Sequence, residues 1–103
     1  MDNLFDHEGF LLQVDTWNEQ IGSQIASSEG IDLTEQHWQV VLLARQFYLE
    51  FDMSPNMRPL VGYVKQHLGS ECGNSMYLMR LFNGLPAKLV SKIAGLPKPS
   101  NCL

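Results

Sequence analysis

Several residue types and patterns are scarce in this chain of 103 residues, and each scarcity excludes a class of protein. Its two cysteines, Cys72 and Cys102, are too few for a disulfide framework and indicate a reducing compartment. No apolar run approaches the roughly 18 residues of a membrane span. The first residues lack the basic and then apolar pattern of a secretory signal. We therefore expect a cytoplasmic protein.

Motifs for metals and cofactors are also missing. The three histidines, His7, His37 and His67, are scattered, and none has a cysteine or acidic neighbour at ligand spacing. The chain has no glycine-rich phosphate loop and no dinucleotide fingerprint. The sequence therefore predicts neither a metal nor an organic cofactor, and it predicts that His37, in the first turn of a helix, faces solvent.

Basic residues are almost missing from the first half of the chain. Before residue 55, Arg45 is the one base beside ten of the eleven acidic residues, whereas six of the seven bases follow residue 54. The net charge of −4 conceals this separation. A basic second half predicts a face for an acidic partner or nucleic acid. Attraction between the two halves, which would aid folding and solubility, is an equally good interpretation.

The composition predicts one folded domain over residues 1–103. With 45% hydrophobic and 17% charged residues, the chain resembles globular proteins. We expect a lead-in at 1–14, a helical core at 15–95 and a mobile arm at 96–103. Apolar residues flank a turn-forming stretch at 6–9, which predicts a short β-hairpin in the lead-in. The predicted class is α+β, mainly α, with this hairpin or meander packed on about five helices.

Capping signals and apolar spacing predict those helices. The first follows Thr16, which with Glu19 fits a capping box. The second runs from Thr34 to Phe51 and is apolar on nearly all sides, so we expect it at the buried centre. The other three are bounded by prolines, asparagine and glycines, and are predicted at 55–68, 75–82 and 86–94.

The tail after Gly95 is of a different kind, because Pro97 and Pro99 exclude helix and favour an extended arm about 20 Å long. A thiol near the end of such an arm is accessible, which makes Cys102 the candidate nucleophile. Lys98 would lower the pKa of this thiol, and the terminal carboxylate would oppose that effect. Cys72, in a predicted loop, is interpreted as an incidental thiol, or as a resolving partner if the arm folds back.

The predicted second to fourth helices could also form a helix-turn-helix, with residues 69–74 as the turn. Its recognition helix would carry Arg80 as its one base, which is little for a DNA-reading surface. A nucleic-acid-binding regulatory module therefore stays an alternative.

Several stretches carry a family resemblance over nearly the whole chain. They are residues 29–34, 37–38, 47–51, 54–55, 73–75, 80–82 and 92–99, closed by the penultimate Cys102. In these stretches the chain resembles the DsrC/TusE family of sulfur-relay proteins. The resemblance implies a small β-hairpin or meander on about five helices with a mobile C-terminal arm, and it implies that Cys102 carries the sulfur.

The resemblance also separates two branches of the family. DsrC of dissimilatory sulfur metabolism has a second arm cysteine eleven positions earlier, where this chain has Ser91. The chain is therefore similar to the single-cysteine TusE branch. That implies a sulfurtransferase which accepts a persulfide sulfur on Cys102 from a TusBCD-like complex. It would serve an MnmA-type thiouridylase that makes 2-thiouridine at the tRNA wobble position, without a cofactor. A DsrC-like partner of sulfite reductase is the alternative that Ser91 disfavours.

Five bases of the second half are candidates for partner binding. We expect them to border the arm and to dock acidic partners or tRNA phosphates, with the two lysines of the last helix facing outward. They are Arg58, Arg80, Lys88, Lys92 and Lys98.

Overall fold

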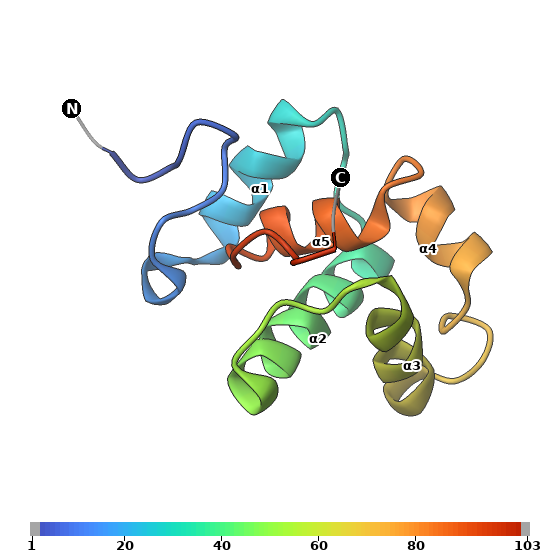
Figure 1. Ribbon diagram of the computed structural model, residues 1–103. Helices are drawn as coiled ribbons and strands as arrows, with labels where there is room; N and C mark the ends of the chain where they lie inside the picture. Colours follow the sequence, from blue (N-terminus) through green and yellow to red (C-terminus); the bar gives the residue numbers. More distant parts are fainter. Residues whose placement is uncertain (1–2, 102–103) are drawn as a thin grey trace.

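Five α-helices make up most of the regular structure in residues 3–101, which are the residues that the computed structural model describes (Figure 1). A short 3-10 helix, η1, precedes them. In chain order the elements are η1 (Val14–Thr16), α1 (Glu19–Ser28), α2 (Glu35–Phe51), α3 (Met57–Leu68), α4 (Ser75–Leu81) and α5 (Pro86–Ile93). None of the helices in this part of the chain has the length and hydropathy to cross a membrane.

The predicted N-terminal β-hairpin is wrong, and the α+β class with it, because the described residues hold no strand. Phe5 and Leu11 form a single isolated antiparallel bridge. The loop between them is organised by the carboxylate of Asp6, which accepts hydrogen bonds from the backbone N–H groups of Glu8 and Phe10, both at 2.9 Å. The Asp6 side chain thus occupies the Phe10 N–H group, which a longer β-ladder would need as a donor. The fold of residues 3–101 is therefore all-helical.

Local capping chemistry sets most helix starts. The side chains of Thr34 and Asn74 accept backbone hydrogen bonds at the starts of α2 and α4, and Pro86 is the first residue of α5, as predicted. The first helix begins later than predicted, because Asn18 caps it by accepting from the N–H of Ile21. Thr16 instead donates its hydroxyl to the Gln13 carbonyl. The N-cap of α3 is Asn56.

The centre of the fold is α5 rather than α2. Helix α5 packs against α1, α2, α3 and α4 (Figure 1). Helix α2 leaves one apolar side open, where the side chain of Leu49 is 79% exposed. The expectation that α2 forms the buried centre was therefore wrong. The arm therefore begins at the end of the most central helix.

Candidate functional site at the root of the arm

The candidate nucleophile, Cys102, lies outside the described residues. The structure describes the segment that leads to it, from the end of α5 to Asn101. The geometry of this segment therefore defines the candidate site.

Two side chains distant in sequence cap the end of α5. The indole Nε1–H of Trp17 donates to the carbonyl of Ile93 at 2.8 Å, and Nη1 of Arg45 donates to the carbonyl of Ala94 at 2.7 Å. The Arg45 guanidinium also lies 4.3 Å from the centre of a Trp17 ring. Burial lowers the pKa of Arg45, although an arginine stays charged in proteins. Donors and a positive charge at a helix C-terminus satisfy its last carbonyls and complement its dipole.

The arm root is closely packed around Gly95. This residue has a φ of +72°, and a Cβ built on it would lie 2.3 Å from Cδ1 of Trp17. The next residue, Leu96, is fully buried, and its N–H donates to the carbonyl of Ser91 at 2.9 Å. Glycine is therefore required by both backbone and space, and the direction of the arm is set at its first residue.

Further along, the arm is bound to the body by three side chains. The hydroxyl of Ser54 donates to the Pro97 carbonyl at 2.5 Å. Asn56 donates to the hydroxyl of Ser100 at 3.3 Å and accepts from the N–H of Asn101 at 3.1 Å. Lys98 forms a half-exposed ion pair with Glu8 at 3.2 Å. Residues 96–101 thus lie along the molecule, and the charge of Lys98 is partly neutralised by Glu8.

Replacing Asn56 by alanine should release the end of this segment. The Asn101 amide loses its acceptor, and a hydrogen bond of this kind contributes about 1 kcal/mol. We expect hydrogen exchange of that amide, followed by NMR, to speed up about fivefold. Ser54→Ala is the matched control, since it removes the bond to Pro97 and leaves the acceptor of Asn101 in place. Equal exchange of Asn101 in wild type and Asn56→Ala would contradict this interpretation.

The five candidate bases have different environments. Lys92 does not face outward, because its ammonium pairs with Glu29 and its side chain is only 12% exposed. It also lies 5.6 Å from the ring centre of Phe10, so it joins α5 to α1 and the N-terminal loop. Arg58, Arg80 and Lys88 form no ion pair within residues 3–101. The prediction that Lys92 faces outward was wrong.

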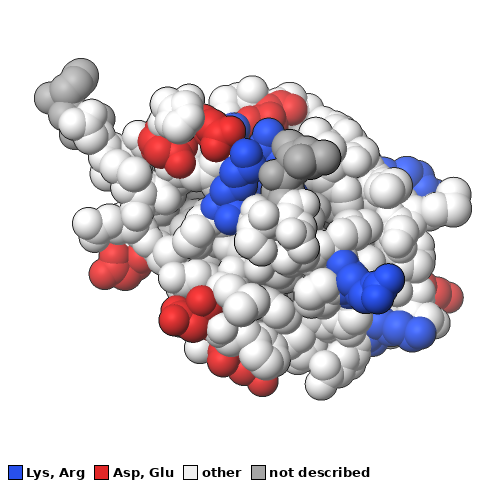
Figure 2. All heavy atoms as spheres, viewed as in Figure 1, with Lys and Arg blue, Asp and Glu red and all other residues white. Residues whose placement is uncertain are grey.

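Charge is also separated in space. In the view of Figure 2, most acidic groups lie over the N-terminal segment, α1 and the end of α2. One group of bases lies beside them near the middle of the face, and the other bases lie on the opposite side over α3 and α4. The asymmetry along the sequence is therefore an asymmetry across this face. The two halves of the chain are joined by two ion pairs between a base of the second half and an acid of the first half. They are Lys92–Glu29 and Lys98–Glu8.

Ser91 is fully buried in α5, and its hydroxyl has no hydrogen-bond partner among the described residues. Position 91 thus lies inside the central helix, before the arm begins. Burying a hydroxyl without a partner costs free energy.

Ser91→Ala should therefore stabilise the fold, by about 1 kcal/mol in the free energy of unfolding, because an unpaired polar group is removed. Urea denaturation of both proteins measures this. Ser54→Ala, which removes a hydroxyl with a partner, should act in the opposite direction. A loss of stability in Ser91→Ala would show that the hydroxyl is satisfied.

Two other residues singled out in the sequence lie away from the arm root. His37 is buried, against the expectation of a solvent-facing ring: its Nδ1 accepts from the Thr34 N–H at 3.0 Å, and Nε2 is 2.8 Å from the Leu81 carbonyl. Cys72 is half-buried beside Tyr77, whose pKa is raised by burial and then by its hydrogen bond with the Cys72 side chain. No group of three potential ligands that could hold a metal occurs in residues 3–101.

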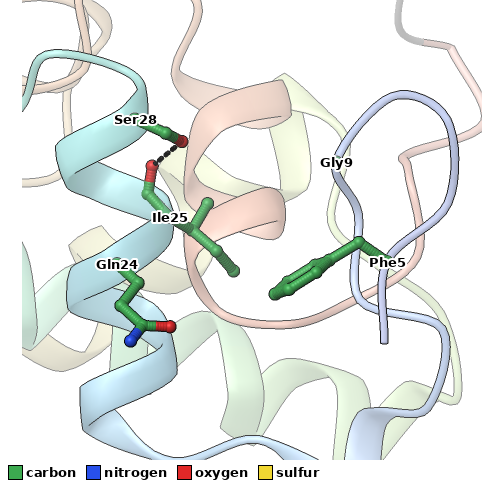
Figure 3. Close-up of a pocket in the computed structure, with 5 residues that line it drawn as sticks. All are labelled: Phe5, Gly9, Gln24, Ile25 and Ser28. Carbon is green, nitrogen blue, oxygen red and sulfur yellow. Dashed lines mark hydrogen bonds between the residues drawn. The ribbon is translucent and has the colours of Figure 1, made fainter. Parts of the chain in front are cut away.

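One pocket borders the N-terminal loop, and another borders the end of the arm. One, of about 280 Å³, lies between the N-terminal loop and α1 and is lined by Phe5, Gly9, Gln24, Ile25 and Ser28 (Figure 3). The Ser28 hydroxyl is already bonded to the Ile25 carbonyl, and no titratable group lines this pocket. The second, of about 300 Å³, is bordered by Asn101, and we call it the arm-end pocket. Its other lining residues are Met57, Met79, Gly84, Leu85, Pro86, Ala87 and Lys88.

Comparison with known proteins now places the chain. A family model described as "DsrC like protein" matches residues 2–103. The chain belongs to the DsrC-like family. The chain is 50% identical over 98 residues to sulfurtransferase TusE of Escherichia coli strain K12 and to that of Salmonella typhimurium strain LT2, covering 95% of this chain and 90% of each relative. The DsrC/TusE resemblance noted in the sequence is thereby confirmed.

Solved DsrC-like structures share the fold. The NMR structure of Allochromatium vinosum DsrC superposes with a TM-score of 0.87 at 38% identity, over 96% of this chain and 88% of that one. The crystal structure of the oxidized gamma-subunit of the dissimilatory sulfite reductase (DsrC) from Archaeoglobus fulgidus gives 0.81 at 34% identity, over 96% and 90%. The helical array of this chain is therefore that of a DsrC-like protein.

The residues that sequence reasoning missed are those at the arm root, Trp17, Arg45, Ser54 and Asn56. One signal was available, since Arg45 is the lone base of the acidic half and lies within an apolar helix. The others give no signal in the sequence, because their partners are 43 to 76 positions away.

Proposed function

We propose that this chain is a TusE-like sulfurtransferase that carries sulfur as a persulfide on Cys102. The observation that carries the proposal is the 50% identity to sulfurtransferase TusE across 95% of the chain. The arm supports it, because residues 96–101 are held against the body of the molecule and lead directly to Cys102.

The chemistry of loading needs no external oxidant. The Cys102 thiolate attacks the outer sulfur of a donor persulfide, a new S–S bond forms, and the old S–S bond breaks. The donor leaves as a thiolate, and the proton of its outer sulfur ends on the new persulfide. The same exchange, with an acceptor thiolate attacking the outer sulfur of the Cys102 persulfide, passes the sulfur on. No metal or organic cofactor is required by these steps.

The partners follow from the TusE likeness. We propose that a TusBCD-like complex donates the sulfur and that an MnmA-type thiouridylase receives it for 2-thiouridine at the tRNA wobble position. Ser91 disfavours the sulfite-reductase role, because the second cysteine by which DsrC is distinguished is replaced by a buried serine. A helix-turn-helix role is disfavoured because α3 and α4 both pack on α5 and only Arg80 is a base on α4.

The test is a loading assay with purified proteins. The chain is incubated with TusBCD that has been charged by a cysteine desulfurase and free cysteine, and its intact mass is measured. We expect a gain of one sulfur atom, which peptide mapping places on Cys102 and which is then found in tRNA 2-thiouridine after MnmA and tRNA are added. No mass gain, or a gain on Cys72 alone, would overturn the proposal.

A further inference from the structure

The arm-end pocket lies where the described part of the arm ends. Its walls come from three segments, namely the start of α3 at Met57, α4 at Met79, and residues 84–88 at the start of α5. Asn101 completes the wall. The peptide bond joins Asn101 to Cys102, so their Cα atoms are about 3.8 Å apart. The pocket is therefore one peptide bond along the chain from the residue that carries the proposed chemistry.

The pocket exposes large apolar side chains to solvent. Leu85 is 54% exposed and Met79 is 45% exposed, and Met76, one turn before Met79 on α4, is also exposed. Exposed apolar side chains that gather in one place, rather than singly, mark interaction surfaces. Methionine side chains adapt their shape to a partner. This surface therefore suits contact with another apolar group.

Three bases lie on the helices that contribute to this pocket, and one of them lines it. Lys88 lines the pocket, and Arg58 follows Met57 on the exposed first turn of α3. Arg80 is exposed four positions after Met76, on the same side of α4. These three bases have no acidic partner within residues 3–101, whereas Lys92 and Lys98 are paired. The rim of the pocket is thus suited to carboxylates.

We propose that the arm-end pocket is the docking surface for the protein that delivers sulfur to Cys102, and that this partner presents an apolar side chain inside an acidic rim. The inference rests on the proposed function and names the surface that serves it. Ser54 and Asn56 hold the arm as far as Asn101, so the pocket wall includes the residue that directly precedes Cys102 in the chain. The apolar lining favours a protein over tRNA, since phosphates gain nothing from Leu85 or Met79.

The test measures initial loading rates with two donors. Leu85→Glu places a charge in the pocket, and Lys88→Glu reverses a rim charge. The donors are TusBCD charged with sulfur, and glutathione persulfide, which is too small to need a docking surface. We expect each variant to load from TusBCD at least about tenfold more slowly, a change of about 1.4 kcal/mol, and from glutathione persulfide at the wild-type rate. Leu49→Glu, on the exposed side of α2, is the matched control and should load normally from both.

The outcomes separate the two proposals. Wild-type rates from TusBCD in both variants overturn the docking surface and leave the carrier function intact. Slow loading from both donors places the defect in the arm rather than in docking, which also overturns it. Normal loading with loss of tRNA binding in a gel-shift titration reassigns the surface to nucleic acid. If wild type loads from neither donor, the carrier function fails, and the docking proposal fails with it. Should Leu85→Glu lose its helical circular dichroism, Lys88→Glu decides.

Discussion

Cys102→Ser is expected to lose all sulfur loading, whichever persulfide is the donor. A serine hydroxyl is not a nucleophile toward a persulfide at neutral pH, because thiol–disulfide chemistry requires a thiolate. The mass gain should fall from one sulfur per chain to none. The unfolding transition should stay within about 0.5 kcal/mol of wild type, as expected for a substitution near a chain end.

The comparison with Cys72→Ser makes this result specific. Cys72 is half-buried between α3 and α4 and packs against the core. Its replacement should leave the amount of loaded sulfur unchanged. Loading that persists in Cys102→Ser and disappears in Cys72→Ser would transfer the carrier role to the loop between α3 and α4. Loading that persists in both variants would refute a cysteine persulfide.

Gly95→Ala is expected to destabilise the fold by about 3 to 5 kcal/mol, a large effect for a single added methyl group. A left-handed backbone costs a residue with a Cβ about 1 to 2 kcal/mol. The added Cβ would also lie 2.3 Å from Trp17, so the indole must move away from the Ile93 carbonyl and from Arg45. For a domain of this size, thermal unfolding should occur more than about 10 °C lower.

Gly30→Ala separates the two contributions to this loss. Gly30 has a φ of +75°, almost that of Gly95, but a Cβ there would have no atom within 4 Å. Its replacement should therefore cost about 1 to 2 kcal/mol, the backbone part alone. Equal losses in the two variants would mean that Trp17 yields without cost and does not fix the arm root.

The helices were predictable because their signals are local. Thr34, Asn74 and Pro86 mark helix starts through bonds or constraints that reach three residues at most. The hairpin was mispredicted because the apolar residues around 6–9 suit a strand pair equally well. The Asp6 carboxylate, whose hydrogen bonds do not depend on strands, decides the outcome.

The arm root was not predictable because it is made by distant pairs. Trp17 meets the Ile93 carbonyl across 76 positions, and Lys92 meets Glu29 across 63. Apolar content likewise could not show which of α2 and α5 is more deeply buried. Leu49 and Ile93 are both apolar, but only Ile93 is buried. Cys102, in contrast, could be proposed as the nucleophile from the sequence alone, because that proposal does not depend on contacts between distant residues.

Helix α5 and the arm together form an out-and-back path. The helix starts at the arm-end pocket and ends at Ile93, and residues 96–101 return to the same pocket at Asn101. The number of residues along this path therefore sets the position of the end of the arm relative to the pocket. One residue inserted into the extended return segment would displace the position after Asn101 by about 3 Å relative to Leu85 and Lys88. We therefore expect the number of residues in the arm, as well as their identity, to affect loading from the donor protein.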